Sequence, residues 1–449
     1  MRIKKITVEK YKNLNNFKCE FSDSNISVFI GNNGSGKSNL LEVITEVFSV
    51  AKKYCEEKRY NLIVYPDIYG CEIEYEKDGI YYIMKYSKSA VAIYCNNQKL
   101  SKSEMNTALP ESIIIYYAGE TNRQARIANN TFDEKYDNRL KNSDNDTFPG
   151  YKYMDYYSVD DLSLLLLTAV VYKGKYYEKL LDLLKCDEIL PRTNIMLKNP
   201  KGKKQDNADT YWNAKGFVQS FLNELRKYVS ATQDMSVKYS MTFFDIELFK
   251  STAEKDIDFF MKLKSLKNAG YLDWIIVELK DKSGQIFSAD LLSEGEKQLS
   301  LIYLLTALTA QDNRLYIFDE FDAYLHLNWQ RLISKMLNDV QVKGHLIFTT
   351  HSPATISKIQ RENVYKMKEG KVSKPLSDTF NRSLDEVMEE QMEVPLRPQE
   401  YTELVQEFRN AIMQNRKDVA LAKLEQIEEI VGESDPFFIT ARIALERMG

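Results

Sequence analysis

The order of apolar and polar residues predicts a chain in which short strands alternate with amphipathic helices. Residues 3–9 and 26–30 have strand patterns, and the second run stops at Gly31, as a buried strand does before a turn. From Ser38 onward, apolar residues recur every three or four positions, which is the spacing of one helix face. Further strand-like stretches follow at 61–65, 71–75, 80–86, 91–94 and 113–117.

The character of the chain changes between about residues 121 and 270. Stretches rich in Asn, Asp and Lys (129–150 and 198–206) separate helical patterns at 160–177 and 217–228. We therefore expect an inserted, mainly helical domain at 121–270, within a head formed by residues 1–120 and 271–376. No heptad pattern persists, so the insert is not expected to be a long coiled-coil arm.

The pattern after the insert predicts strands within 272–290, joined by a hairpin turn at Lys282–Gly284. A helix, a strand, a helix and a strand then follow to Thr350. Residues 377–449 read as a helical tail, whose last helix is expected to begin with Asp435 as its cap and Pro436 in its first turn. The apolar stripes of the tail fit equally well a bundle that packs on the body and an interface for assembly or partner binding.

The amino-acid composition limits the classes of protein to which this chain can belong. The 449 residues are 44% hydrophobic and 28% charged, as in an ordinary globular protein. With a net charge of −4, the surface as a whole does not attract nucleic acid, so contacts with nucleic acid would need a local patch of basic residues. The lysines between Lys198 and Lys204 are a candidate, although a solvated loop explains them as well.

Cysteine, histidine and hydropathy patterns exclude further classes. The five cysteines form no C-x-x-C pair, which argues against a zinc site and a disulfide framework and suggests a cytoplasmic protein. With three histidines, a histidine-rich metal nuclease site is hard to build. The longest apolar stretch, Leu162–Tyr172, is too short to cross a bilayer, so we expect no membrane association.

A phosphate-binding loop lies between the predicted strand at 26–30 and the helix after it. Its glycines let backbone N–H groups converge on phosphate oxygens, and the helix directs its positive end at the same anion. Lys37 is expected to neutralise the β- and γ-phosphates of ATP, and Ser38 to ligate Mg²⁺. The predicted ATP-binding residues here are Gly31, Asn32, Asn33, Gly34, Ser35, Gly36, Lys37, Ser38 and Asn39.

Two adjacent carboxylates end the apolar run Leu315–Phe318. Asp319 is expected to hold the Mg²⁺, directly or through water. Glu320 points the other way and is placed to polarise the attacking water. Together with the phosphate loop, this pair predicts an ATPase.

A third motif identifies the class. Leu292-Ser293-Glu294-Gly295-Glu296-Lys297-Gln298 resembles the signature segment of ABC ATPases. Ser293 and Gly295 offer a helix start to a γ-phosphate, and Glu296 belongs to the same predicted nucleotide contact. The resemblance implies an α/β ABC-ATPase head, with a mixed sheet lobe and a parallel-sheet core. It also implies that this helix contacts the nucleotide of another copy, in a head-to-tail homodimer or a larger assembly.

Two more segments complete the resemblance. Phe348–Pro353 is similar to the switch-histidine segment, in which His351 would contact the γ-phosphate. Asp322 stands in the segment that crosses the dimer seam in the family. Phe321 and Leu327 depart from the pattern, since relatives often carry proline there. Glu120, Asn122 and Gln124 all lie near the expected glutamine loop, and that role stays open.

The short insert is typical of RecF-like and OLD-like ATPases. Residues 1–50, 111–124 and 288–449 most resemble PtuA, the ATPase of Septu-type and retron-associated anti-phage systems. The resemblance implies a subunit whose ATP-driven dimerisation gates a separate HNH-type nuclease, with nucleic acid reached through the complex. Two alternatives remain: a RecF/SMC-like ATPase that clamps DNA in repair, and a sensor or scaffold that binds ATP without hydrolysing it.

Overall fold

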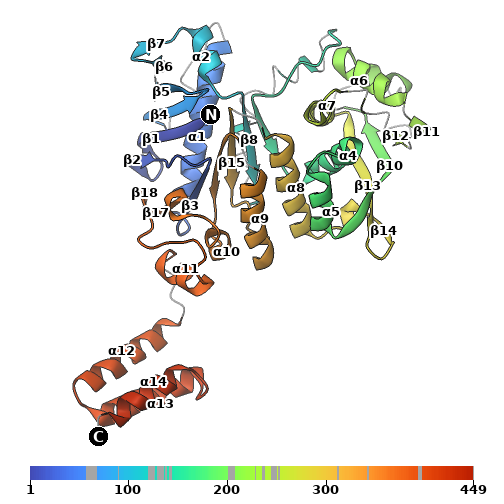
Figure 1. Cartoon of the computed structure of the whole chain (residues 1–449). Coiled ribbons are helices and arrows are strands. Elements are labelled where there is room, and N and C mark those ends of the chain that lie inside the picture. Colours follow the sequence, from blue (N-terminus) through green and yellow to red (C-terminus); the bar gives the residue numbers. More distant parts are fainter. Residues whose placement is uncertain are drawn as a thin grey trace. The chain divides into compact units, whose positions relative to one another are not determined.

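The chain folds into two compact units, residues 1–381 and residues 382–449 (Figure 1). The structure is a computed structural model. It describes residues 1–56, 68–88, 90–119, 127–128, 136, 139–140, 144–200, 208–227, 229–234, 238–243, 250, 253–310, 313–340, 343–392 and 397–447.

The core of the first unit is a seven-stranded, mostly parallel sheet. Its strands in spatial order are β18 (Lys371–Ser373), β17 (Val364–Lys368), β3 (Ile26–Ile30), β16 (His345–Thr349), β15 (Arg314–Asp319), β8 (Ser112–Tyr117) and β9 (Met154–Tyr157). Every residue of β3, β15 and β16 is buried, as expected for central parallel strands covered on both faces. Because these strands run parallel, their carboxyl ends meet at one edge of the sheet.

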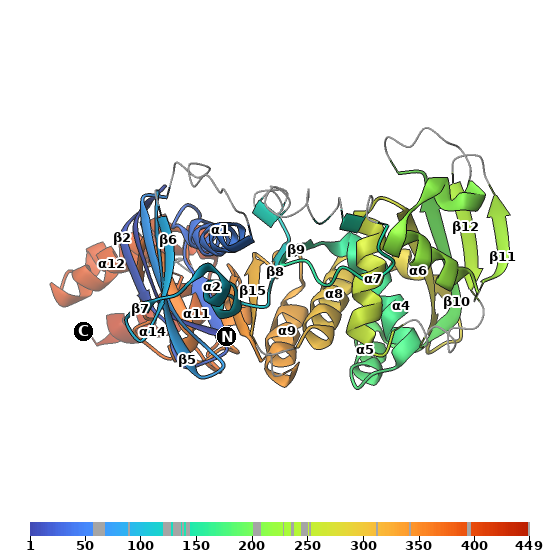
Figure 2. The same ribbon diagram turned by 90° about the horizontal axis from the view of Figure 1, so that it is seen from above.

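A six-stranded antiparallel sheet lies across helix α1 (Lys37–Glu56) from the core sheet (Figure 2). Its strands in spatial order are β2 (Leu14–Glu20), β1 (Arg2–Tyr11), β4 (Gly70–Lys77), β5 (Ile80–Ser87), β6 (Ala90–Cys95) and β7 (Gln98–Lys99). The apolar residues of α1 and both sheets form one core. Helix α2 (Lys102–Ala108) packs on α1 and β6. The strands expected around 71–75, 80–86 and 91–94 are confirmed, whereas the one at 61–65 lies outside the described residues.

The insert contains a sheet that the sequence did not predict. Its strands in spatial order are β11 (Val229–Asp234), β12 (Lys238–Phe243), β10 (Cys186–Lys198), β13 (Leu272–Asp281) and β14 (Ile286–Ser288). The expectation of a mainly helical insert was therefore incomplete, because the partner of β10 lies some 80 residues further along the chain. Strand β13, which follows the expected boundary at residue 270, completes the sheet of the insert.

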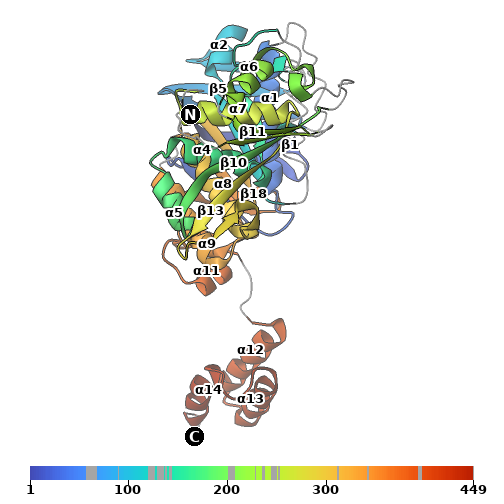
Figure 3. The same cartoon turned by 90° about the vertical axis from the view of Figure 1, so that its right-hand side faces the viewer.

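Helices cover this sheet, with α4, α5 and α7 lying along β10 and β13 (Figure 3). The helices are η2 (Val159–Asp161), α4 (Leu162–Tyr172), α5 (Tyr177–Leu184), η3 (Ala208–Asn213), α6 (Gly216–Arg226) and α7 (Asp256–Asn268). The apolar run at 162–172 is the buried helix α4, which also packs against α7 and α8. No helix in the described ranges has the length and hydropathy needed to cross a membrane.

The remaining elements of the first unit follow the predicted order. They are η5 (Ala289–Leu291), α8 (Glu294–Leu308), α9 (Leu327–Val340), α10 (Pro353–Ile356) and η6 (Arg361–Asn363). The turn at Lys282–Gly284 joins β13 to β14 as expected.

The second unit is helical, with α11 (Leu384–Glu390), α12 (Gln399–Met413), α13 (Lys417–Val431) and α14 (Phe437–Glu446). It begins at Arg382 rather than at 377. Gly432 ends α13 at φ +78, and the Asp435 carboxylate accepts a hydrogen bond from the Phe437 N–H at 2.9 Å. The N-cap of α14 is Pro436, so the helix starts one residue later than expected, although the Asp435 carboxylate contacts its first N–H.

Candidate functional site: a phosphate loop, a carboxylate pair and an exposed helix start

The phosphate loop joins β3 to α1 at the carboxyl edge of the core sheet. A β-carbon on Gly31 would lie 2.2 Å from the Met367 carbonyl oxygen, and Gly34 and Gly36 have φ of +76 and +110, so the loop needs glycine at these positions. The Lys37 ammonium donates to the carbonyl oxygens of Gly31 (2.7 Å) and Asn32 (3.2 Å). The lysine is therefore held inside the loop.

Asn13, in the turn between β1 and β2, supports the phosphate loop through two hydrogen bonds. The Asn13 side-chain amide donates to the Gly34 carbonyl oxygen at 2.8 Å, and its oxygen accepts from the Asn39 amide at 2.7 Å. A β-carbon on Gly36 would meet the Asn13 side chain at 3.0 Å. Sequence reasoning missed Asn13, because a lone asparagine in a hairpin carries no motif. Asn39, predicted to touch nucleotide, contacts Asn13 here.

The predicted metal ligands lie side by side. The Ser38 hydroxyl donates to Asp319 Oδ1 at 3.2 Å, and the Thr349 hydroxyl donates to the same oxygen at 2.5 Å. Burial raises the pKa of Asp319 to about 6, while the two hydroxyl donors and the Lys37 charge oppose that rise. A buried carboxylate with so little positive charge nearby favours a cation.

Glu320 leaves the strand in a left-handed conformation, with φ of +48. Its backbone N–H donates to the Thr349 hydroxyl at 2.9 Å, so Thr349 links both acids of the pair. This strain for a non-glycine residue is typical of functional sites.

Two basic side chains at the site, Lys37 and His351, have lowered pKa values. Burial brings the pKa of Lys37 down to about 8, and the charges of Asp319 and Glu320 only partly compensate. Burial and the Lys37 charge lower the pKa of His351 to about 4, so the imidazole is neutral at pH 7. An anion bound in the loop would reverse the effect on Lys37.

Asp322 holds the segment that carries His351. Its buried carboxylate accepts hydrogen bonds from the hydroxyls of Thr350 (2.6 Å) and Thr355. Its carbonyl oxygen accepts from Gln330 at 3.1 Å. Within one chain the Asp322 carboxylate thus points inward, and its contact with a nucleotide across the dimer seam stays a prediction. Phe321, at the position where proline was expected, is buried and packs edge-on against Phe348 at 4.6 Å.

The signature segment forms a capped, exposed helix start. The Ser293 hydroxyl accepts from the Glu296 N–H at 3.4 Å, and the Glu296 carboxylate accepts from the Ser293 N–H at 2.9 Å. Glu296 therefore caps the helix rather than facing an open site. A β-carbon on Gly295 would lie 3.2 Å from the Trp329 ring. No hydrogen bond between described residues joins this segment to the phosphate loop.

The loop fits a triphosphate with Mg²⁺. The Ser35 hydroxyl is buried and has no hydrogen-bond partner among the described residues, although it lies in the middle of the loop. Lys37 is buried beside it with carbonyl partners. A buried hydroxyl without a partner, such as that of Ser35, is suited to donate to a phosphate oxygen. Ser38 and Asp319 would hold the metal together with phosphate oxygens and water. No group of three or more His, Cys, Asp or Glu side chains that could hold an ion occurs in the described ranges.

The remaining residues considered in the sequence are His345 and the three candidates for the glutamine loop. His345 is structural, as expected: Nδ1 accepts from the Ile3 N–H at 3.1 Å, and Nε2 lies 3.0 Å from the Ser27 hydroxyl. Glu120, Asn122 and Gln124, the candidates for the glutamine loop, lie outside the described residues.

Comparison with known proteins supports this description. The family model for the RecF/RecN/SMC N terminal domain matches residues 2–374. The Retron Ec83 probable ATPase of Escherichia coli is 22% identical over 93% of this chain and 81% of its own length. The Retron Vc95 probable ATPase of Vibrio cholerae serotype O1 biovar El Tor is 22% identical over 94% and 86%.

Solved structures give a weaker likeness. The SMC head domain from Thermotoga maritima covers 83% of this chain and 98% of its own, at 14% identity and a TM-score of 0.38. The recombination mediator protein RecF-ATPrS covers 84% of this chain and 98% of its own, at 16% identity and a TM-score of 0.34. Because the family model spans more than half of the residues, the chain belongs to the RecF/RecN/SMC N-terminal domain family and carries an ABC-type ATPase head.

Proposed function

We propose that two copies of this chain close on ATP and Mg²⁺, hydrolyse the ATP, and thereby gate a separate HNH-type nuclease in cytoplasmic anti-phage defence. The observation that carries the ATPase part is the cluster at the edge of the core sheet. Ser38, Asp319 and Thr349 share hydrogen bonds there, and Glu320 follows on a strained turn. The defence part rests on the resemblance to retron ATPases and PtuA.

Each residue has a part in the proposed reaction. Lys37 and the loop N–H groups bind the phosphates, and Mg²⁺ held at Ser38 and Asp319 would neutralise charge on the γ-phosphate. Glu320 accepts a proton as water attacks the γ-phosphorus, and the bond to the β-phosphate breaks to leave ADP and phosphate. His351, neutral at pH 7, donates its N–H to a γ-phosphate oxygen.

The second copy would complete the site. The Ser293 helix start is exposed, and among the described residues it makes no hydrogen bond to the phosphate loop of its own chain. A nucleotide held by another head would reach it by displacing the Glu296 carboxylate that caps it. Closure then gains contacts to both nucleotides at once.

The test is Glu320→Gln, with Glu400→Gln on the exposed face of α12 as a matched control. We expect turnover to fall at least about 100-fold, because the base is lost, while ATP and Mg²⁺ still double the mass measured by light scattering. The control should behave as wild type. Equal turnover in Glu320→Gln and wild type would refute the ATPase proposal. A monomeric Glu320→Gln protein at saturating ATP would refute the shared site.

The alternatives make different predictions. A sensor would keep ATP uncleaved for hours in the wild type. A DNA clamp needs a basic patch, yet the Lys198 ammonium is paired with Asp273 at 3.0 Å. The rest of that lysine run lies outside the described residues. A nuclease assay on the purified chain with and without a co-expressed HNH protein tests the gating.

A further inference from the structure

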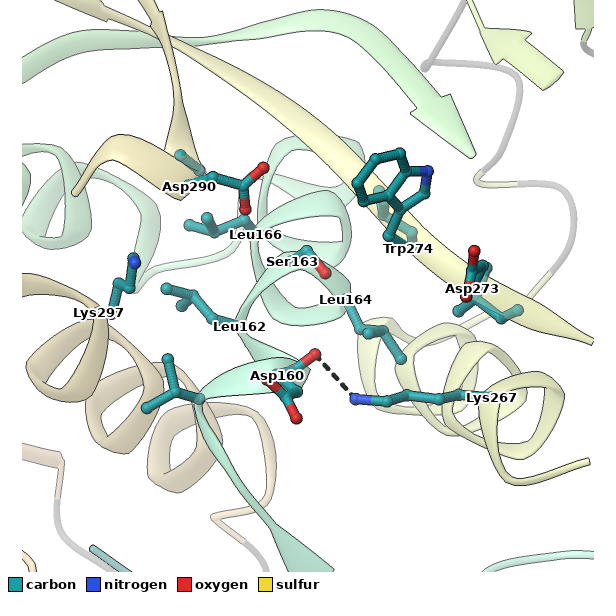
Figure 4. Close-up of a pocket in the computed structure, with 14 residues that line it drawn as sticks. Asp160, Leu162, Ser163, Leu164, Leu166, Lys267, Asp273, Trp274, Asp290 and Lys297 are labelled. Atoms are coloured by element: carbon teal, nitrogen blue, oxygen red, sulfur yellow. Dashed lines mark hydrogen bonds between the residues drawn. The ribbon is translucent and has the colours of Figure 1, made fainter. Parts of the chain in front are cut away.

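A cavity of about 310 Å³ lies between α4, β13 and the first turn of α8 (Figure 4). Helix α4 lines it with Leu162, Ser163, Leu164 and Leu166. The residues of η5 and Lys297 form the wall nearest the signature segment. Its size is at the lower end of the range of ligand sites in proteins.

The cations in the wall are already neutralised. The Lys267 ammonium donates to Asp161 Oδ1 at 2.6 Å and to the Asp160 carbonyl oxygen at 2.8 Å. Lys297 pairs with Glu294 at 2.9 Å. A bound anion would therefore have to compete with existing carboxylates.

Two carboxylates of the wall are available. Asp160 and Asp290 are exposed, and neither forms an ion pair in the described part of the chain. Asp290 accepts only a long hydrogen bond of 3.3 Å from the Ser288 hydroxyl among its described contacts. Figure 4 shows the two side chains on either side of Leu162. The cavity thus places two exposed carboxylates, without ion pairs in the described part of the chain, beside the leucines of α4.

An aromatic ring adds a second recognition element. Trp274 on β13 is 53% exposed and lies at the end of the cavity opposite Lys297 (Figure 4). Tryptophan is the best aromatic partner of a cation, and a planar guanidinium can stack on it and also bind a carboxylate through two N–H groups. Leu291, next to Asp290, is 75% exposed and gives an apolar contact that a small free cation would not use.

We propose that this cavity binds an arginine side chain presented by a partner protein. The guanidinium meets Asp160 and Asp290, its methylene stem lies on the α4 leucines, and Trp274 contributes its ring. The neighbouring Leu291 packs against the partner's backbone or next residue.

Binding here would act on the nucleotide site, and this consequence rests on the proposed function. Asp290 precedes Ser293 by three residues, and Lys297 lies on the first turn of the same helix. A guanidinium that draws Asp290 inward changes the position of the helix start that another head offers to ATP. The cavity therefore couples partner binding to head closure.

The experiment uses the full chain and two short capped peptides, Gly-Arg-Leu-Gly and Gly-Glu-Leu-Gly, with binding followed by calorimetry. We expect the arginine peptide alone to bind. Asp160→Asn, Asp290→Asn and Trp274→Ala should each weaken it about tenfold, as loss of a charge-assisted contact does. Asp418→Asn, an exposed carboxylate on α13, is the control and should bind as wild type.

Several results would overturn the proposal. These are equal binding of the two peptides, no binding of either, or wild-type affinity in Asp160→Asn and Asp290→Asn together. Loss of ATP-dependent dimers in the two variants, without arginine binding in the wild type, would assign the cavity to self-association instead. Binding needs no ATP, so it stands or falls separately from ATPase activity. The coupling is tested by the peptide's effect on turnover, which should vanish in Asp290→Asn.

Discussion

The role of Asn13 as a support for the phosphate loop leads to a quantitative prediction. In Asn13→Ala two hydrogen bonds disappear, the 2.8 Å bond to the Gly34 carbonyl and the 2.7 Å bond from Asn39. At about 1 kcal/mol each, their loss removes about 2 kcal/mol from the ordered form of the loop. If nucleotide binds that form, its affinity should fall by a factor of about 10 to 30, since 1.4 kcal/mol is tenfold.

The assay separates affinity from chemistry. KM and the Kd of a fluorescent ATP analogue should rise together, whereas kcat at saturating ATP should change less than about twofold because Asn13 touches none of the reacting groups. Asn15→Ala, exposed in the same hairpin, is the control for general damage. An unchanged Kd, or a fall in kcat equal to the fall in kcat/KM, would refute the positioning role.

Two further predictions concern stability, measured by denaturant unfolding without nucleotide. Asp161→Asn leaves the buried Lys264 ammonium without its 2.6 Å partner and should lower the free energy of unfolding by about 3–5 kcal/mol. A decrease below about 1 kcal/mol would contradict this. The control is Asp144→Asn, which removes an exposed ion pair with Lys215. Burial lowers the pKa of His345 to about 3 from 6.5, so the unfolded chain binds a proton that the folded one does not. The free energy of unfolding should therefore fall by about 1.6 kcal/mol from pH 6.5 to pH 5 through this group. His345→Gln should lose that part of the slope, and an unchanged slope would argue against it.

The site was predictable where one short stretch of sequence determines each part. The apolar run before Gly31 specifies a buried strand, the glycines specify the loop, and the periodicity after Ser38 specifies the helix. The apolar run before Asp319 specifies a second buried strand of the same sheet, separated from the first by β16. Because parallel strands end at one edge, local patterns alone brought Ser38 and Asp319 together, and their 3.2 Å hydrogen bond agrees with that expectation.

What escaped prediction depends on contacts between distant segments. Strand β10 contains a proline and has mixed polarity, and its pairing with β13 becomes visible only once α7 has returned the chain to it. Asn13 supports the phosphate loop through Gly34, which lies 21 residues further along the chain. The inward orientation of Asp322 depends on the hydroxyls of Thr350 and Thr355, which no motif marks as its partners.

The capped state of the signature helix bears on how the proposed dimer would close. Glu296 accepts from both the N–H and the hydroxyl of Ser293, at 2.9 and 2.8 Å, so the donors meant for a γ-phosphate are occupied by a carboxylate of the same chain. A triphosphate on a second head must displace that carboxylate, since two anions cannot share one helix start without strong repulsion. Closure of the dimer therefore costs the cap of the signature helix, typically about 1 kcal/mol, at each of the two nucleotide sites. Heads without nucleotide therefore have reason to stay apart, and only the combined contacts of two bound nucleotides bring them together.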